Sequence, residues 1–350
     1  MKSTAAKWIG WIVRLAVFVA LVIWLSHRLD WTQLRDIGYR AVAHPLGLIG
    51  GTLLLLLTAL AAALRWRGLL LAQDVTLPAT RVMSIFFIGQ FFNSFMLGAC
   101  GGDMARIYYI LRDTTARRTE TATSVLIDRG IGVFIQIWLG CALIFLVWPL
   151  VKVHAALQTV TLLMFAFGGG AALLLALLLW KNIFDHIAWF RRLELATPLG
   201  ARFRRAYEEF FRYRRRPQAL ASAAIYSVLS LLFQIAAVAC LGQSLGITAS
   251  FTSYLVFIPI IGVFASIPLT PGSFGVREGL FVVLFQAVGV DAHQAVLLSL
   301  LFYAAGLVWS LVGGAIFLGY NAGAGFNLRE ELARIRSGAA DDETPPPAAL

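Results

Sequence analysis

Long apolar runs separated by short charged segments dominate the sequence. An α-helix of roughly 20 apolar residues crosses a hydrocarbon core about 30 Å thick. Six runs have this character: Trp8–Leu25, Pro45–Leu64, Val125–Leu150, Leu157–Trp180, Ala219–Leu245 and Ala295–Tyr320. The first is too long for the hydrophobic region of a signal peptide and carries Arg14 near its middle, so we expect it to be retained. The pattern predicts an all-α integral membrane protein with about six full transmembrane helices.

Two further apolar segments are interrupted by glycine and proline. Val82–Leu111 is broken at Gly98–Gly102, and Phe251–Val290 is broken at Pro268–Gly275. Basic residues mark cytoplasmic loops, and the segment Lys181–Gln218 holds ten of them. Segments 65–81 and 112–124 are basic as well, so the chain between them must enter and leave on the cytoplasmic side. The same reasoning makes the second broken segment begin and end outside. We predict two re-entrant broken-helix hairpins that enter from opposite faces.

The order of span, broken hairpin and span therefore occurs twice with opposite entry sides, which is typical of an inverted repeat in transporters. We expect a single transmembrane domain over residues 1–320, with a first repeat over about 46–150 and a second over about 219–320. A basic linker, 181–218, lies between them on the cytoplasmic side and contains an amphipathic surface helix over 198–216. The tail 321–350 is charged and has three consecutive prolines near its end, and we predict that it is short, cytoplasmic and disordered.

Composition agrees with this class of protein. Hydrophobic residues make up 59% of the chain and charged residues only 13%, against about 25% in a soluble domain. The net charge of +11 is consistent with positive cytoplasmic loops and anionic lipid partners, and no nucleic-acid motif accompanies it. The three cysteines and five histidines show no paired or ligand-like spacing, so we predict no disulfide, metal or cofactor.

Ionisable residues in or beside the broken segments are the candidates for function. A charge near the bilayer centre is costly, so such residues usually face a bundle interior or a wet cavity. Helix starts near Asp103 and Val276 are candidate anion sites, because free N–H groups and a positive dipole end lie there. Two structural readings stay open. The glycines could simply permit tight helix packing, and Asp128-Arg129 could be an interfacial ion pair. The candidate charges are Asp103, Arg106, Asp128, Arg129, Arg277 and Glu278.

These residues carry a family resemblance. The run from Asn93 to Leu97, the run from Gly101 to Arg106, the Asp128-Arg129 pair and Pro271–Glu278 resemble signatures of the lysylphosphatidylglycerol synthase transmembrane-region family, also called flippase-like domain or uncharacterised protein family 0104. The sequence departs from the family at Gly98-Ala99, where proline-glycine is usual, and at Tyr303, where a basic residue is common. The soluble aminoacyl transferase domain of some members has no counterpart here, so we expect no lysylphosphatidylglycerol synthesis.

The resemblance implies a protein that translocates or handles an anionic phospholipid or a polyprenyl-phosphate-linked lipid in a bacterial-type cytoplasmic membrane, with both termini cytoplasmic. A membrane-embedded enzyme that modifies lipid headgroups, or a noncatalytic partner subunit of one, remains an alternative, as does a homo-oligomer. We predict no catalytic residues. The predicted substrate-binding and translocation residues are Asn93, Gly101, Gly102, Asp103, Arg106, Asp128, Arg129, Pro271, Gly272, Gly275, Arg277, Glu278 and Tyr303.

Overall fold

The computed structural model describes residue 39 and residues 45–95, 101–114, 118–179, 213, 216–267 and 273–321. This part of the chain is helical and contains no strand. Its helices are α3 (Pro45–Ala72), α4 (Ala79–Phe95), α5 (Gly101–Asp113), α6 (Arg118–Leu143), a 3-10 turn η1 (Ile144–Val147), α7 (Trp148–Val153), α8 (Ala155–Leu179), α12 (Pro217–Ser244), α13 (Phe251–Ala265), α14 (Val276–Gln286) and α15 (Ala292–Asn321).

Five stretches in the described residues are long and apolar enough to cross a membrane: Pro45–Ala72, Thr121–Val153, Ala155–Leu177, Pro217–Ser244 and Ala292–Tyr320. They confirm five of the predicted spans and make the protein a multi-pass membrane protein. The remaining predicted span, Trp8–Leu25, lies outside the described residues.

One predicted boundary is wrong. The first described helix was expected to end at Leu64, but α3 continues to Ala72. The expected end rested on treating Arg65 and Arg67 as a cytoplasmic flank. Arg65 is instead a buried residue inside the helix, where it is ion-paired.

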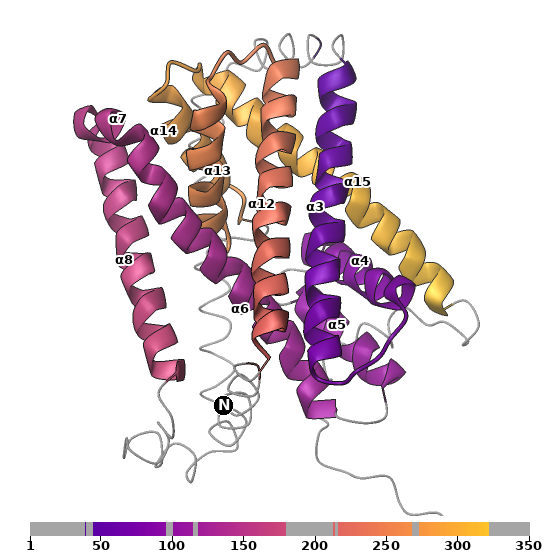
Figure 1. Cartoon of the computed structure of the whole chain (residues 1–350). Coiled ribbons are helices and arrows are strands. Elements are labelled where there is room, and N and C mark those ends of the chain that lie inside the picture. The colour runs from indigo at the N-terminus through magenta and orange to yellow at the C-terminus, as the bar shows by residue number, and fades with distance from the viewer. Residues whose placement is uncertain are drawn as a thin grey trace, which may run out of the picture.

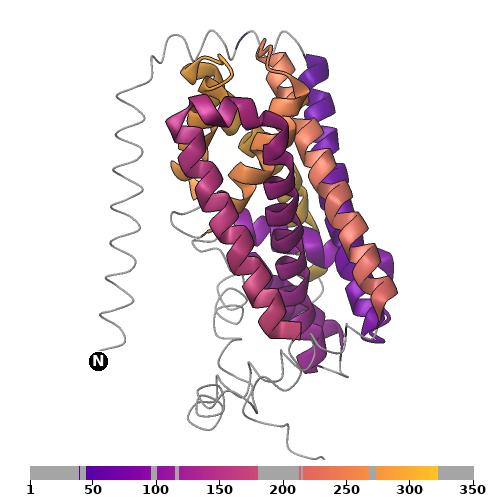
Figure 2. The ribbon, with the colours of Figure 1, turned by 60° about the vertical axis from the view of Figure 1, so that its left-hand side comes forward.

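The long helices α3 and α12 lie side by side along most of their length (Figures 1 and 2). Small residues permit this close approach. A Cβ on Gly47 would lie 2.6 Å from the carbonyl oxygen of Cys240, and one on Gly51 would lie 2.7 Å from the side chain of Leu241. Trp309 of α15 ties the third long helix to this pair by donating its indole N–H to the carbonyl oxygen of Thr52 at 2.7 Å.

The short helices occupy opposite ends of the long ones. In Figure 1, α4 and α5 lie toward the bottom, while α13 and α14 lie toward the top. The α4–α5 pair starts and finishes at the bottom, where α3 ends and α6 begins, and the α13–α14 pair starts and finishes at the top. Each pair also packs against a long helix of the other half of the chain, α4 against α15 and α13 against α6.

Helices flank both predicted breaks. The first break separates α4, which ends at Phe95, from α5, which begins at Gly101. The second separates α13, which ends at Ala265, from α14, which begins at Val276. These starts confirm the predicted helix beginnings near Asp103 and Val276. Residues 96–100 and 268–272 lie outside the described part.

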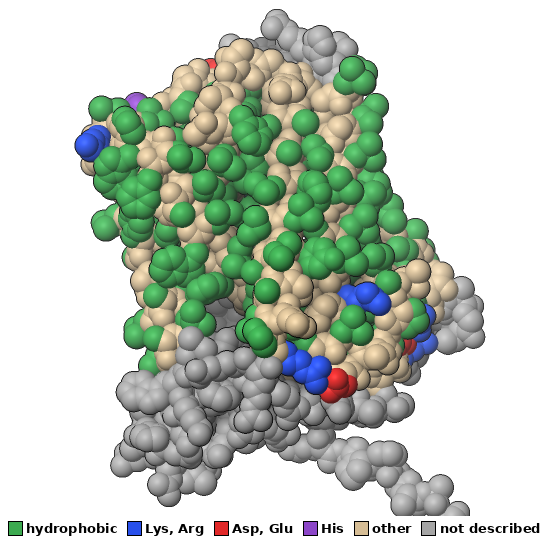
Figure 3. Space-filling view, in the orientation of Figure 1, with side chains coloured by type: hydrophobic (Ala, Val, Ile, Leu, Met, Phe, Trp, Pro, Cys, Tyr) green, Lys and Arg blue, Asp and Glu red, His purple; other side chains and the backbone are tan. Residues whose placement is uncertain are grey.

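The molecular surface fits a membrane. Figure 3 shows hydrophobic side chains covering the middle of this face, with most of the described charged side chains near its lower end. The last residues of α3 and α8 and the first residues of α12 lie at that end. In the sequence, each of these helix ends is next to a basic segment predicted to be cytoplasmic.

Of the predicted amphipathic helix over 198–216, only two residues are described. Tyr213 donates its hydroxyl to the carbonyl oxygen of Leu69 at 3.0 Å, and Arg216 bonds the carboxylate of Asp74 at 3.2 Å. The remainder of that segment and the tail beyond Asn321 lie outside the described residues.

The contact between α15 and α4 gives a stability prediction. A Cβ on Gly313 would lie 2.0 Å from the carbonyl oxygen of Phe87, and a backbone atom cannot move aside cheaply. We expect Gly313→Ala to lower the free energy of unfolding in detergent by about 1–3 kcal/mol, the usual cost of overpacking. An SDS titration monitored by circular dichroism measures it.

Gly319→Ala on the same helix is the matched control, because a Cβ there meets no atom within 4 Å. It should leave stability unchanged or raise it by up to about 1 kcal/mol, since alanine favours helix. Equal stability of the two variants would show that the α15–α4 contact is not as close as described.

Candidate functional site

A cavity of about 530 Å³ lies where the short helices meet the long ones. Its volume is within the range of small-molecule sites. Although the surrounding helices are apolar, much of its lining is polar: Arg65, Gln90, Asn93, Ser94, Asp103, Arg106, Asp128, Arg129, Gln136, Ser227, Ser230, Gln234, Ser266, Ser273 and Tyr303. Charged residues in this lining come from α3, α5 and α6. We call Arg65, Asp103, Arg106, Asp128 and Arg129 the five-charge cluster.

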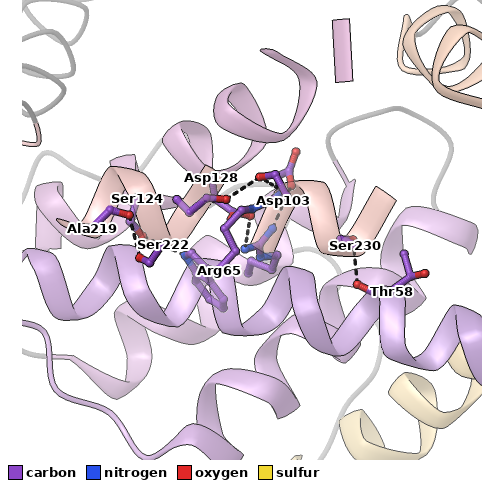
Figure 4. A network of polar contacts seen from close by, with 12 residues as sticks. Thr58, Arg65, Asp103, Ser124, Asp128, Ala219, Ser222 and Ser230 are labelled. Atoms are coloured by element: carbon purple, nitrogen blue, oxygen red, sulfur yellow. Dashed lines mark hydrogen bonds and ion pairs between the residues drawn. The ribbon is translucent and has the colours of Figure 1, made fainter. Parts of the chain in front are cut away.

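Asp128 is the centre of the five-charge cluster. Its side chain is 1% exposed, and its two carboxylate oxygens accept from different arginines. Arg65 of α3 donates Nε to Oδ1 at 2.7 Å, and Arg106 of α5 donates Nη2 to Oδ2 at 3.0 Å. Figure 4 shows Arg65 and Asp128 pointing toward one another, with Asp103 beside them. A buried charge is tolerated when it is paired and hydrogen-bonded, so this bridge fixes α3, α5 and α6 relative to one another.

The guanidinium of Arg106 is held by two aromatic rings as well as by Asp128. Its carbon lies 4.1 Å from the ring centre of Trp66 and 4.9 Å from that of Phe86. Trp66 is fully buried and is itself oriented by donating its indole N–H to Ser124 at 3.1 Å. The Nε atom of Arg106 is buried and has no hydrogen-bond partner. One donor of a fixed guanidinium therefore remains unused beside the cavity.

The remaining acid of the five-charge cluster is Asp103, in the first turn of α5. Arg129 of α6 donates Nη1 to its Oδ2, and Arg106 approaches its other oxygen only to 3.9 Å. In the part of the chain that the structure describes, three arginines and two aspartates thus line the large cavity, which leaves one net positive charge when both acids are ionised. Such a cavity favours an anion.

The start of α5 is anchored to α4 through close backbone contact. Gly102 donates its N–H to the side-chain oxygen of Asn93 at 3.0 Å. A Cβ on Gly102 would lie 2.1 Å from the carbonyl oxygen of Gly89, so only glycine fits here. Gly101 and Gly102 are both buried, and the contact brings Asp103 and Arg106 to the cavity wall.

A second polar group lies at the start of α14. Arg277 and Glu278 are both buried, and Arg277 donates Nη2 to Glu278 Oε1 at 2.6 Å. Ser299 of α15 joins them, since it accepts from Arg277 Nε at 3.0 Å and donates to Glu278 Oε1 at 3.0 Å. We call Arg277, Glu278 and Ser299 the Arg277 group.

The backbone of the second break supports this group. Glu278 Oε2 accepts from the N–H of Gly275 at 2.6 Å, which caps the first turn of α14. Gly275 has φ of 84°, in the region that favours glycine. The carboxylate is therefore fully occupied by protein donors and holds one side of the Arg277 guanidinium.

Two aromatic rings flank the other part of that guanidinium. Its carbon lies 4.7 Å from the ring centre of Tyr303 and 5.3 Å from that of Phe274. The two rings pack edge to face, 4.8 Å apart. Tyr303 therefore positions Arg277 by its ring and also lines the large cavity.

Two smaller cavities, each of about 300 Å³, adjoin the large one. Arg277 lines both of them, and Gln234 of α12 lines all three. Ser266 and Ser273 lie in the wall between the large cavity and the first of the smaller ones. The two charged groups thus line neighbouring cavities that share wall residues.

Most sequence-predicted site residues are brought together in two groups. Asn93, Asp103, Arg106, Asp128, Arg129 and Tyr303 line the large cavity, and Gly101 and Gly102 lie buried at the start of α5 beside them. Arg277 lines the two smaller cavities, and Gly275 and Glu278 hold it from the start of α14. Pro271 and Gly272 lie outside the described residues.

The charged residues of this set are paired across helices as well as along α5. Arg106 lies within ion-pair distance of Asp103 on the same helical face, at 3.9 Å, and its hydrogen bond goes to Asp128 across the α5–α6 contact. Asp128 and Arg129 are chain neighbours that bond different residues. Asp128 is almost fully buried within the bundle, whereas Arg129 is partly exposed.

Sequence reasoning missed Arg65 and the uncharged polar residues of the wall, among them Gln136, Ser227 and Gln234. Arg65 donates Nη1 to Ser227 at 3.2 Å in addition to its bond with Asp128. The signal for Arg65 was available, because the apolar run resumes at Leu69-Leu70-Leu71 after Arg67. Isolated glutamines within apolar runs gave a weaker signal for the rest.

Comparison with known proteins identifies relatives of this architecture. A family model described as the lysylphosphatidylglycerol synthase TM region matches residues 11–314. A UPF0104 membrane protein of Pyrococcus horikoshii is 25% identical over 264 residues, which cover 68% of this chain and 76% of that protein.

The bridge at Asp128 predicts an asymmetric mutational cost. In Asp128→Asn two buried arginines lose their carboxylate, and breaking a buried ion pair costs about 3–5 kcal/mol. We expect a loss of this size in the free energy of unfolding, measured by SDS titration. The double variant Arg65→Gln, Asp128→Asn should recover part of it, because one unpaired charge is removed as well.

Asp74→Asn is the matched control. Asp74 pairs with Arg216 while both side chains are about half exposed, and such pairs contribute at most about 1 kcal/mol. Similar losses for Asp128→Asn and Asp74→Asn would mean that the Asp128 bridge does not organise the bundle.

Proposed function

The chain belongs to the lysylphosphatidylglycerol synthase transmembrane-region family, and from that premise we propose that it carries the headgroup of an anionic membrane lipid through its cavities while the acyl chains remain in the bilayer. The family is a membrane-protein family consistent with a lipid-related role. The substrate class follows from the chemistry of the cavity. Phosphodiesters of phospholipids and phosphates of polyprenyl lipids are both anions that arginine binds well.

One observation carries the proposal: the large cavity has excess positive charge inside an apolar bundle. Arginines are costly at membrane depth and usually mark a pathway when they occur there. Three of them line this cavity, and two acids accompany them among the residues that the structure describes.

The packing of the helices supports an inverted repeat as the scaffold of this pathway. Each short pair packs against the last long helix of the other half, α4 on α15 and α13 on α6, while α3 and α12 pair at the centre. In this proposal α4–α5 and α13–α14 are re-entrant hairpins from opposite faces, and the cavities form where they meet. Transporters with inverted repeats place their sites at such an interface.

The proposed orientation puts the lower end of Figure 1 in the cytoplasm. α8 ends and α12 begins at that end, so in the sequence the basic linker follows the one and precedes the other there, as the positive-inside rule requires. Both termini are then cytoplasmic, in a bacterial-type cytoplasmic membrane. The five-charge cluster faces the inner leaflet in this arrangement, and the Arg277 group faces the outer leaflet.

Arg106→Gln tests the function. Removal of the guanidinium leaves the large cavity without net positive charge, and a hydrogen bond to a charged group contributes about 1.5–3 kcal/mol. We therefore expect translocation of fluorescent phosphatidylglycerol in proteoliposomes to slow by about 10-fold to 100-fold. Bleaching of outer-leaflet probe by dithionite measures the rate, and polyprenyl phosphate serves as the second substrate.

Arg216→Gln is the matched control, since it removes the same charge from an exposed position outside the cavities. Wild-type protein that moves neither lipid faster than empty liposomes contradicts the proposal. A lipid whose mass changes on incubation with the protein would instead favour a headgroup-modifying enzyme.

A further inference from the structure

We propose that Arg277 is a second phosphate-binding subsite, to which the headgroup passes from the five-charge cluster. This inference rests on the proposed function and adds to it a two-step pathway. It is drawn from the positions of the two arginine groups, from the unused donors of Arg277 and from the uncharged wall that joins them.

The two groups are carried by short helices that enter the bundle from opposite ends, α5 from the lower end of Figure 1 and α14 from the upper end. Arg65 is seven residues before the end of α3 at Ala72, which is about 10 Å along the axis at 1.5 Å per residue. Arg277 is nine residues before the end of α14 at Gln286, about 13 Å from the opposite end. A headgroup that passes from the five-charge cluster to Arg277 therefore moves from the helix that enters at one end of the bundle to the helix that enters at the other.

Arg277 retains the donors that a phosphate needs. A guanidinium offers five N–H groups in a rigid fork. Its hydrogen bonds use Nε and Nη2, and Nη1 has no partner among the described residues. The Nη1 edge of the fork is thus unoccupied in a residue that lines both smaller cavities. Such an edge binds a phosphate oxygen pair bidentately.

The rings of Tyr303 and Phe274 orient the guanidinium of Arg277. They lie against the guanidinium and hold its plane, so the fork is already oriented before a ligand arrives. Ser299 and Glu278 hold the other side. These contacts reduce the entropy lost on binding, which a free surface arginine would not do.

The wall between the groups is polar but uncharged. Gln136, Gln234, Ser266 and Ser273 line both the large cavity and the first smaller one. Amides and hydroxyls can replace water around a phosphate without holding it as strongly as a charge does. The described residues therefore provide charged groups at the two ends of the route and neutral donors in the middle.

The decisive variant is the double substitution Arg277→Gln, Glu278→Gln. It removes the fork together with its counter-ion, so no unpaired buried charge remains, and the glutamine at 278 can still accept from Gly275. Phosphatidylglycerol binding, measured by native mass spectrometry, should stay within about twofold of wild type because the five-charge cluster is intact. Translocation in proteoliposomes should fall by about 10-fold or more.

Two further variants serve as comparisons for this result. Arg106→Gln should weaken binding and translocation together, since it removes the first subsite. Arg277→Lys, Glu278→Gln restores a charge without the planar fork and should recover only a small part of the rate. If the Gln–Gln variant translocates within about twofold of wild type, Arg277 is a structural residue and the inference is wrong. Weakened binding equal to that of Arg106→Gln would also overturn it, because both groups would then form one site.

A photo-crosslink separates this inference from the proposed function. Phe302 lines both smaller cavities beside Arg277, and benzoylphenylalanine in its place reports a lipid that reaches them. An adduct with phosphatidylglycerol that disappears in the Gln–Gln variant supports the subsite even if wild-type protein gives no net translocation. No adduct with phosphatidylglycerol, in a protein that translocates it, would overturn the subsite and leave the function standing.

Discussion

The carboxylate of Asp128 shared between two arginines is the interaction on which the site depends. In hydrocarbon neither arginine would be tolerated alone, and neither could be satisfied by water. Because Arg65 comes from α3, Arg106 from α5 and Asp128 from α6, satisfying the charges requires these helices to meet at one point. Electrostatics thus sets the place where the short helix is attached to the long ones. The cavity follows, because ion-paired heads and their hydrogen-bond partners cannot pack like aliphatic side chains.

Five of the six predicted spans and their order were predictable from the sequence because a membrane forces each spanning helix to be long and apolar. The end of α3 was not, and Arg65 shows why. A basic residue after an apolar run marks either a membrane interface or a buried pair. Only its partner, 63 residues away in Asp128, distinguishes the two. Counting charges along the chain contains no information about such a contact.

The candidate site, too, was predictable from the sequence only in part. Glycines at the breaks and charges within apolar segments identified Gly102, Asp103 and Arg277, since few other roles justify them at membrane depth. The partners were not predictable from spacing. Arg106 lies one turn from Asp103, but its hydrogen bond goes to Asp128, and Arg129 reaches Asp103 from the neighbouring helix. Gln234 lies in an ordinary apolar run and gains its importance only where three cavities meet.

The different charge balance of the two groups bears on how a headgroup could move. Passage through a pathway requires sites that bind well enough to attract the ligand and weakly enough to release it. The five-charge cluster has one excess positive charge, whereas Arg277 is neutralised by Glu278. A phosphate at Arg277 therefore shares its arginine with a carboxylate that is already bound, and repulsion between the two anions favours release. Two equally strong arginine sites would hold the headgroup instead, so the presence of Glu278 beside Arg277 suits an exit better than a storage site.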